Sequence, residues 1–226
     1  MSSGVSVDII VPNYNKSPYL EEAITSVINQ TFQNWYLYII DNNSTDNSQI
    51  IIDSLNKKNK KIRPIFLKRN KGVSFSRNLG LRISSSKYVC FLDSDDVWDV
   101  KKLQKQVNFM EQYNYAFSYT NYTPFIVSKG KKSFLKTIIP PLEFTYKKFL
   151  KNTSISTSTM IVNRQIIKFM KFPKVKTLED YIFKCNLLKK TNAIKLNLNT
   201  TYYRILKKSL SSSKIKNIYW LFILNS

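Results

Sequence analysis

Between positions 88 and 96 the sequence reads Tyr88-Val89-Cys90-Phe91-Leu92-Asp93-Ser94-Asp95-Asp96, an apolar run that ends in three carboxylates. The chain has only 14 acidic residues and a net charge of +22, so composition alone does not explain this clustering. Neighbouring carboxylates raise one another's pKa unless a cation neutralises them. The run therefore predicts a buried strand whose carboxyl end holds Mg²⁺ or Mn²⁺ through Asp93 and Asp95, with open positions for substrate phosphates. A solvated acidic turn that caps the next helix is the alternative.

Outward from this run, strand and helix patterns alternate. Apolar and β-branched spacing predicts strands over residues 5–11, 35–40, 62–67 and 88–92, and helices over 18–29, 44–56, 73–84 and 101–113. This alternation predicts an α/β fold with a mainly parallel central sheet and helices on both faces. Such sheets bind ligands outside the carboxyl ends of their strands. Asn13, Asp41 and the carboxylates at 93–96 all follow strand ends, so we expect them to line one crevice.

The second half of the chain has a weaker pattern. Residues 116–121 and 156–162 are expected to be strands, and the spacing of apolar residues predicts a helix over 178–190. Residues 123–150 contain three prolines and a run of lysines. We expect this stretch to be an irregular or partly mobile insertion, a common place for substrate-binding elements.

Composition limits the class of protein. A hydrophobic content of 43% over 226 residues is enough for one substantial core. Two cysteines, Cys90 and Cys185, are too few for a disulfide framework and favour a reducing compartment. The first residues lack the basic region of a secretory signal, and no stretch is apolar enough to span a bilayer. These features predict a cytoplasmic protein.

The 36 lysine and arginine residues are spread along the whole chain. This spread argues against one element that reads a nucleic-acid groove, and no helix-turn-helix, zinc-finger or RNP signature is present, so no nucleic-acid partner is expected. Anionic lipids or phosphorylated ligands explain the charge better. A basic, aromatic-rich module that binds membranes or nucleic acid is the non-enzymatic alternative, because 31 aromatic residues (14 Tyr, 14 Phe, 3 Trp) permit stacking.

Five motifs in order give the chain a resemblance to the family 2 inverting glycosyltransferases. They are Val7-Asp8-Ile9-Ile10-Val11-Pro12-Asn13-Tyr14-Asn15, Asp41-Asn42-Asn43-Ser44-Thr45-Asp46, Arg77-Asn78-Leu79-Gly80, Phe91-Leu92-Asp93-Ser94-Asp95-Asp96 and Glu179-Asp180-Tyr181. The resemblance implies a GT-A fold, a nucleotide-sugar donor that is usually a UDP-sugar, and Mn²⁺ or Mg²⁺. It implies one catalytic domain over residues 1–210, in which 1–115 bind the nucleotide sugar and 116–210 bind the acceptor and supply the base.

The resemblance also assigns roles to single residues. Asp180 falls on the catalytic base, and Glu179 assists it or orients the acceptor. Asp95, with Asp93, falls on the metal. The residues expected to contact the nucleotide sugar are Pro12, Asn13, Tyr14, Asn15, Asp41, Asn43, Arg77, Asp93, Ser94 and Asp95. A plain turn residue is the alternative for Asp41, and a solvated helix surface is the alternative for Arg77.

The chemistry that these roles require is simple. A metal neutralises the leaving diphosphate, and a carboxylate on the other side of the sugar takes the proton of the acceptor hydroxyl. As in inverting glycoside hydrolysis, acid and base sides flank the anomeric carbon, so the product has inverted configuration. The implied acceptor is a glycan or a lipid-linked glycan in surface-polysaccharide synthesis.

Two features depart from the family pattern. The family's usual Tyr-Arg-x-His is here Tyr203-Arg204-Ile205-Leu206, and the chain contains no histidine. Lys207 or Lys208 is then the candidate to neutralise phosphate, and a catalytically impaired family member is the alternative. The Asp93 run also resembles the first motif of haloacid dehalogenase-like phosphatases, but there the motif follows the first strand, whereas here three predicted strands precede it.

The tail over residues 211–226 is basic and then apolar. Its lysines and aromatic residues are typical of a segment that lies in a membrane interface, and a terminal helix packed on the core is the alternative. A truncated C-terminal segment is a further alternative for these residues. We expect peripheral contact with the inner face of the cytoplasmic membrane.

Overall fold

The computed structural model describes residues 4–206. Its strands are β1 (Val7–Asn13), β2 (Trp35–Asp41), β3 (Ile62–Phe66), β4 (Tyr88–Phe91), β5 (Val97–Trp98), β6 (Phe117–Ser128), β7 (Lys131–Phe134), β8 (Glu143–Phe144), β9 (Ile161–Asn163) and β10 (Ala193–Arg204). Its helices are α1 (Ser17–Ile28), α2 (Ser48–Lys58), α3 (Val73–Ile83), α4 (Lys102–Tyr113), α5 (Tyr146–Lys151), the short 3-10 helix η1 (Thr157–Thr159), α6 (Arg164–Ile167) and α7 (Glu179–Leu188).

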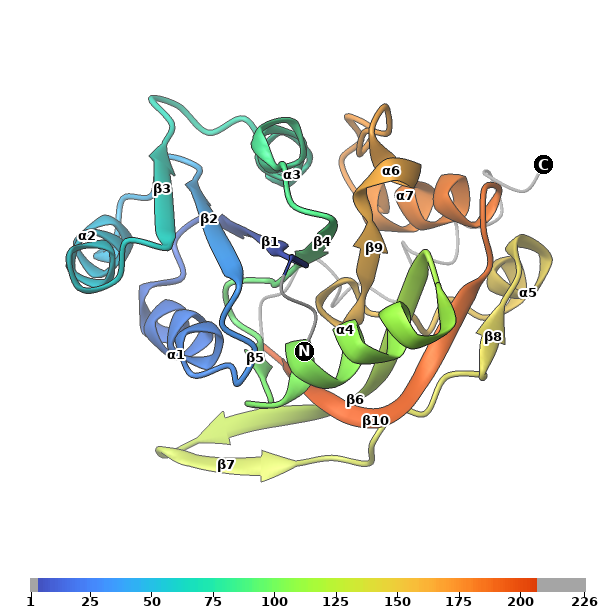
Figure 1. Ribbon diagram of the computed structural model, residues 1–226. Coiled ribbons are helices and arrows are strands. Elements are labelled where there is room, and N and C mark those ends of the chain that lie inside the picture. The colour runs from blue at the N-terminus through green and yellow to red at the C-terminus, as the bar shows by residue number, and fades with distance from the viewer. Residues whose placement is uncertain (1–3, 207–226) are drawn as a thin grey trace.

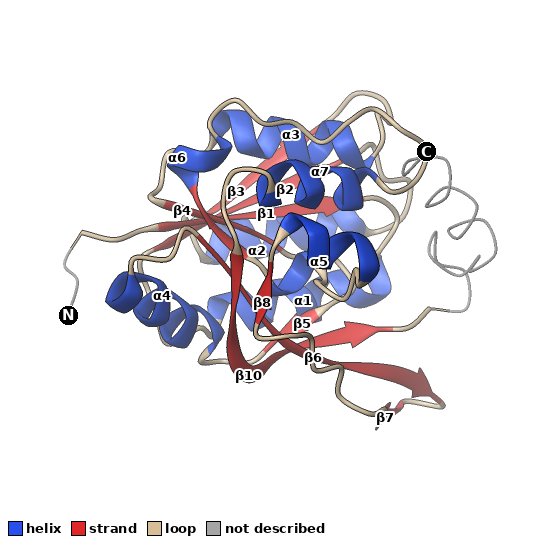
Figure 2. Cartoon of the chain, turned by 90° about the vertical axis from the view of Figure 1, so that its right-hand side faces the viewer, coloured by secondary structure: helices blue, strands red, loops and turns tan. Residues whose placement is uncertain are grey.

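These strands form one sheet in the order β3-β2-β1-β4-β9-β6-β10-β5, with β7 paired to β6 and β8 paired to β10. Helices cover both faces of the sheet (Figures 1 and 2). The longest pairings, β1 with β2 and β6 with β10, are parallel, and the short β9 runs antiparallel between β4 and β6. The predicted α/β fold with a central sheet is confirmed.

Each face of the sheet has its own core because neighbouring strand residues point to opposite sides. On one face Ile9 and Leu37 pack with apolar residues of α1, α2 and α4. On the other face Ile10 and Phe91 pack with apolar residues of α3, α5 and α7. A strand that is buried on both faces has a continuous apolar sequence, which explains why these strands could be predicted.

The expectation of an irregular insertion over residues 123–150 is wrong. β6 continues through Pro124 to Ser128, turns at Gly130 with a φ of 75°, and pairs with β7. The carbonyl of Pro124 accepts a 2.8 Å hydrogen bond from Leu135 N. β8 and α5 complete the stretch, and β10, which had no prediction, pairs with β6 along most of its length.

No helix within residues 4–206 combines the length and apolar character needed to cross a bilayer. The predicted membrane-facing tail over 211–226, together with Lys207 and Lys208, lies outside the described residues.

Candidate active site

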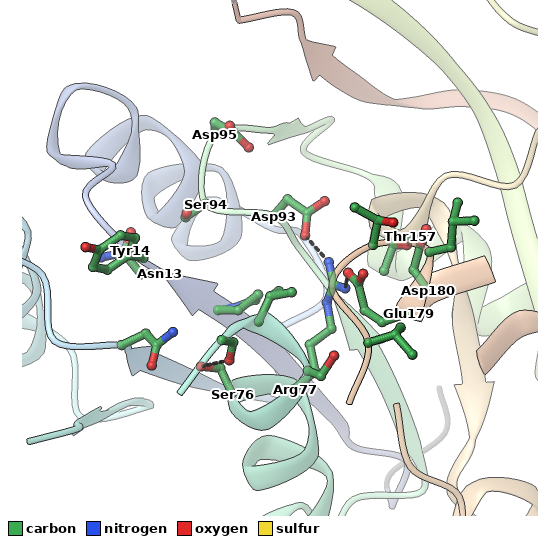
Figure 3. A pocket seen from close by; sticks show the side chains of 18 of the residues that line it. Asn13, Tyr14, Ser76, Arg77, Asp93, Ser94, Asp95, Thr157, Glu179 and Asp180 are labelled. Carbon is green, nitrogen blue, oxygen red and sulfur yellow. Dashed lines mark hydrogen bonds and ion pairs between the residues drawn. The ribbon is translucent and has the colours of Figure 1, made fainter. Parts of the chain in front are cut away.

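A pocket of about 950 Å³ opens at the carboxyl ends of the central strands (Figure 3). The predicted site residues that line it are Pro12, Asn13, Tyr14, Arg77, Asp93, Ser94, Asp95, Glu179 and Asp180. These residues come from the end of β1, α3, the loop after β4 and α7, and Asn42 of the motif after β2 also lines the pocket, so the fold brings residues of all five sequence motifs together. The crevice predicted at the strand ends is present, but Asp41 and Asp96, which were also expected to line it, are buried and do not.

In the motif after β2, Asn42 lines the pocket, whereas Asp41 lies behind the lining. Asp41 is fully buried and accepts hydrogen bonds from Asn13 Nδ2 (2.8 Å), Ser44 Oγ (2.5 Å), Ser44 N (3.0 Å) and Gln49 Nε2 (3.0 Å). Asn15 accepts from Thr45 N at 2.8 Å and, like Asn43, is not among the lining residues. Asp41 thus holds Asn13 in place, and Asn13 Oδ1 is buried with no hydrogen-bond partner among the described residues.

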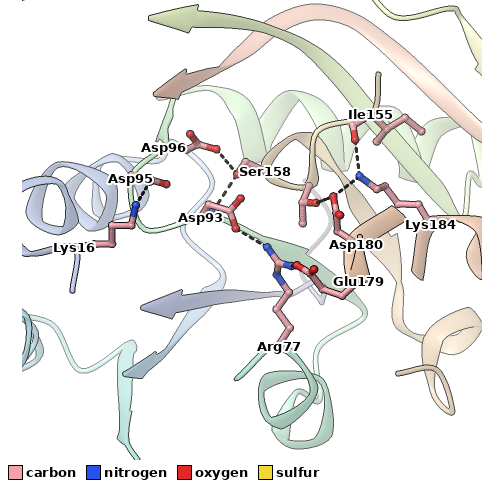
Figure 4. A network of polar contacts seen from close by, with 11 residues as sticks. Lys16, Arg77, Asp93, Asp95, Asp96, Ile155, Ser158, Glu179, Asp180 and Lys184 are labelled. Atoms are coloured by element: carbon pink, nitrogen blue, oxygen red, sulfur yellow. Dashed lines mark hydrogen bonds and ion pairs between the residues drawn. The ribbon is translucent and has the colours of Figure 1, made fainter. Parts of the chain in front are cut away.

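Four carboxylates of the pocket are each paired with a cation (Figure 4). Arg77 spans two of them, with Nη2 2.8 Å from Asp93 Oδ1 and Nη1 2.9 Å from Glu179 Oε1. Lys16 Nζ lies 2.6 Å from Asp95 Oδ2. Arg77 is buried, with 5% of its side chain exposed, so the alternative of a solvated helix surface is wrong.

Asp180 is held from two sides. Its Oδ2 accepts from Lys184 Nζ at 2.8 Å and from Thr157 Oγ1 at 3.1 Å. Lys184 is anchored in turn by the Ile155 carbonyl at 2.8 Å. Burial alone would raise the pKa of Asp180, but Lys184 and Arg77 hold it well below its usual range. Asp180 is therefore ionised at neutral pH, and its other oxygen accepts no hydrogen bond from the described residues.

Unlike the pKa of Asp180, those of Glu179, Asp95 and Arg77 are raised. Burial raises the pKa of Glu179 above its ordinary value, although Arg77 opposes the rise. Burial also raises the pKa of Asp95, and Asp93 adds to the rise. Burial would lower the pKa of Arg77, but Asp93, Asp180 and Glu179 raise it instead. An added positive charge beside Asp95 would thus be stabilised.

Sequence reasoning did not identify η1, which bridges the two halves of the site. Ser158 Oγ donates to Asp96 Oδ2 (2.6 Å) and accepts from Asp93 N (3.1 Å), while Thr157 reaches Asp180. Asp96 is buried behind the loop, with Arg204 N as its second donor at 3.0 Å. The run of hydroxyl residues at 156–159, which interrupts a predicted strand, was the available signal.

The donor set at Asp93 and Asp95 fits a hard divalent cation. Both carboxylates line the pocket, and oxygen ligands suit Mg²⁺ and Mn²⁺. Within residues 4–206 no group of three or more His, Cys, Asp or Glu is placed to hold a metal. A cation of this kind needs only one or two protein carboxylates when substrate phosphates supply further oxygens.

The segment that lacks the family histidine adjoins this loop. Arg204 Nε donates to the Asp95 carbonyl at 2.8 Å, and Arg204 Nη2 lies 2.6 Å from Glu22 Oε2. Leu206, at the histidine position, has no atom that can ligate a metal. Arg204 thus fastens the end of β10 to the acidic loop.

Comparisons with known proteins agree with this geometry. The profile described as Glycosyl transferase family 2 matches residues 8–172. The chain is 35% identical over 211 residues to the putative teichuronic acid biosynthesis glycosyltransferase TuaG of Bacillus subtilis, covering 93% of this chain and 83% of that protein. It is 34% identical over 214 residues to the UDP-Glc:alpha-D-GlcNAc-diphosphoundecaprenol beta-1,3-glucosyltransferase WfgD of Escherichia coli, covering 94% and 82%.

Among solved structures, S. aureus TarS 1-349 in complex with UDP-GlcNAc superposes with a TM-score of 0.79. The identity is 21%, and the match covers 97% of this chain and 65% of that chain. At this identity the likeness concerns the fold.

Proposed function

The chain belongs to glycosyl transferase family 2 and has the GT-A fold, and we propose that it is an inverting, metal-assisted enzyme that transfers a sugar from a UDP-sugar to a lipid-linked glycan in surface-polysaccharide synthesis. The observation that carries this proposal is the single pocket that unites Asp93 and Asp95 with the ionised Asp180. The names of TuaG and WfgD support the type of product, and that of WfgD supports the donor and the lipid-linked acceptor.

We assign the nucleotide to the end of the pocket formed by β1 and α3. Asn13 Oδ1, buried and without a partner, is an acceptor that the N3–H of a uracil ring would satisfy. Asp41 then acts through Asn13, which it holds at 2.8 Å, and this role is consistent with the full set of hydrogen bonds that Asp41 already accepts. Tyr14, 45% exposed at the pocket, offers a ring for the base to pack against.

Asp95 and Asp93 would hold Mn²⁺ or Mg²⁺. When bound, the metal supplies positive charge that stabilises the leaving diphosphate. Lys16 contacts Asp95 and lines the pocket, so it adds a positive charge at the same end. This assignment places residues 1–115 on the donor side and residues 116–210 on the acceptor side.

Asp180 is the proposed base. Lys184 and Thr157 fix one carboxylate oxygen and leave the other for the acceptor hydroxyl. A carboxylate with a low pKa is a weak base, so it accepts the proton late, as the new glycosidic bond forms. Glu179 is held by Arg77 and orients the acceptor rather than taking its proton.

Calorimetric titration of UDP into the protein, with and without Mn²⁺, tests the donor assignment. We expect binding that strengthens with Mn²⁺, and Asn13→Leu should weaken it in both conditions, because the base loses its hydrogen-bond partner. Absence of UDP binding with and without the metal would contradict the proposal. Transfer from UDP-sugars to a diphosphate-linked N-acetylglucosamine acceptor then tests the reaction itself.

A second candidate is a family member that binds the donor but transfers slowly. Leu206 favours it, because a leucine cannot replace the usual histidine. Under this alternative UDP binds with Mn²⁺ as above, yet turnover stays low and rises when Leu206→His restores a ligand.

A further inference from the structure

The segment between α6 and α7 combines lysines with exposed apolar side chains. It reads Lys168-Phe169-Met170-Lys171-Phe172-Pro173-Lys174-Val175-Lys176. Phe169 is 84% exposed, the highest value among the large apolar side chains of residues 4–206, and Val175 is 44% exposed. None of the four lysines forms an ion pair with a carboxylate of the described chain. The segment therefore shows solvent both positive charge and an aromatic ring.

One buried residue fixes the position of this segment. The backbone of Phe172 exchanges two 2.8 Å hydrogen bonds with the side chain of Asn78 on α3. Its ring is 2% exposed and stacks on Phe183 of α7 with centroids 3.9 Å apart. Because Phe172 is anchored to two helices, the exposed residues on either side of it are held at a defined place.

The same segment also borders the pocket. Lys174, Val175 and Lys176 line it, only a few residues before Glu179 and Asp180. Arg77 and Lys184, which also line the pocket, each lie 2.8 Å from a carboxylate oxygen, of Asp93 and Asp180 respectively. Lys174 and Lys176 have no carboxylate partner among the described residues, so they are available to a group outside the protein.

We propose that residues 168–176 dock on an anionic lipid surface, with Phe169 entering the headgroup region and the lysines contacting lipid phosphates. Lysines around an aromatic ring are typical of interfacial membrane contacts. A single ring surrounded by ammonium groups lacks the contiguous apolar area of a protein interface. The inference rests on the proposed function, because docking would bring the end of the pocket with Asp180 to a lipid-linked acceptor.

The test is co-sedimentation of the full chain with vesicles of phosphatidylglycerol and phosphatidylcholine, compared with pure phosphatidylcholine. Phe169→Ser should weaken binding to the anionic vesicles about tenfold. The triple variant Lys171→Gln/Lys174→Gln/Lys176→Gln should weaken it on the order of a hundredfold. Every variant keeps residues 207–226, so any contribution of the tail is common to all.

The matched controls lie on α2 and the turn after it, at the opposite side of the molecule (Figure 1). Ile50 is 71% exposed, and Lys57, Lys58 and Lys60 are exposed lysines with no acidic partner in the described part of the chain. Ile50→Ser and Lys57→Gln/Lys58→Gln/Lys60→Gln should leave binding unchanged. If they weaken it as much as the test variants do, net charge and not this segment causes binding, and the proposal is wrong.

A second readout locates the contact. An environment-sensitive dye on Phe169→Cys should shift to the blue with anionic vesicles, and the same dye on Ile50→Cys should not; Cys90 and Cys185 are buried. No shift at position 169, or no vesicle binding at all, overturns the proposal. UDP titration does not depend on vesicle binding, so the two proposals can fail separately. If UDP binds but the vesicles do not, only this inference is refuted. If the vesicles bind but UDP does not, only the proposed function is refuted.

Discussion

At the scale of single residues, the site depends on which carboxylate can accept a proton. Asp180→Asn keeps an oxygen for Lys184 and Thr157 but removes the negative charge. We expect transfer to fall by about 10²- to 10⁴-fold, the usual contribution of a general base, while the affinity for UDP stays unchanged. Turnover with a saturating acceptor and calorimetry with UDP measure the two quantities. Full turnover in this variant would remove Asp180 as the base.

Lys184 sets the protonation of that base. Lys184→Met removes the neighbouring cation, so the pKa of Asp180 should rise and the acid limb of the kcat/KM profile should move to higher pH. Because the folded-state pKa of Asp180 is depressed, its contribution to stability is present above its unfolded value, about 3.9. This contribution disappears as the pH falls through the folded value.

The wild type and Lys184→Met should therefore differ in unfolding free energy, and this difference should become smaller towards acid pH. Urea unfolding across a pH series measures it. Lys189→Met, at the C-cap of the same helix and facing Tyr146, is the control and should leave the acid limb where it is. If the acid limb of the kcat/KM profile stays at the same pH in Lys184→Met, a group other than Asp180 determines that limb.

At the scale of elements, Gly80 explains why the Arg77 motif contains a glycine. A Cβ at Gly80 would lie 2.5 Å from Ile10 Cγ2, so α3 packs directly on β1 and carries Arg77 to Asp93 and Glu179. In an open helix, Gly→Ala stabilises by roughly 1 kcal/mol. Here Ile10 is fully buried and cannot move away, so the clash prevails.

We therefore expect Gly80→Ala to destabilise the protein by about 1–3 kcal/mol, as overpacked cores do. Chemical denaturation measures the change. Gly4→Ala is the matched control, since a Cβ there meets nothing within 4 Å. A Gly80→Ala protein as stable as the control would show that the contact with Ile10 relaxes without cost.

The second element is η1, which is supported from behind by a buried lysine. Lys102 Nζ donates to the Thr159 carbonyl (3.0 Å) and to Gln106 Oε1 (2.7 Å), and Trp98 Nε1 donates to the Ser158 carbonyl (2.8 Å). Lys102 is fully buried and has no carboxylate partner within residues 4–206, and burial lowers its pKa to about 7. Thr157 and Ser158 thus face the site from a fixed support.

We expect Lys102→Met to keep or increase stability, because an apolar side chain replaces a costly buried charge. Turnover should nevertheless fall, roughly a hundredfold if η1 shifts by an ångström. Thermal unfolding and turnover together separate the two effects, and exposed Lys105→Met on the same helix is the control. Unchanged turnover would show that η1 does not need this support.

The pH dependence has a defined sign. Between about pH 7 and pH 10 the unfolded lysine binds a proton that the folded one has released. The stability of the wild type relative to Lys102→Met should therefore rise with pH in this window, by about 1.4 kcal/mol per pH unit.

At the scale of the whole molecule, the donor should couple the acidic loop to global stability. A ligand that binds only the folded state stabilises it by about 2.7 kcal/mol at a hundredfold excess over Kd. UDP with Mn²⁺ should then raise the thermal midpoint of the wild type by several degrees, roughly 2–4 °C per kcal/mol. Asp95→Ala should lose the part of this increase that depends on Mn²⁺. An equal Mn²⁺ effect in both proteins would place the metal elsewhere.

Prediction from sequence succeeded where the signal was local. The apolar runs at Val7 and Tyr88 identify strands buried on both faces, and Asp93 and Asp95 stand out because they end such a strand. It failed over residues 123–150, where prolines and lysines suggested irregular chain. There the partner strand β10 decides the structure, and a residue's pairing with a distant strand is not visible in its own neighbourhood.

The sequence by itself determined the four longer strands and four helices through residue 113, though not the short β5, together with the carboxylates at the strand ends and the family, because periodicity and motif spacing are properties of neighbouring residues. Only the tertiary structure decided which of the 36 lysines and arginines meet those carboxylates. Arg77 bonds both Asp93 and Glu179, which lies 102 positions after Arg77, and η1 joins Asp93 to Asp180. Such contacts form when elements that are distant in the sequence pack together at one edge of the sheet. The residues next to a side chain in the sequence do not indicate which distant residue it will contact.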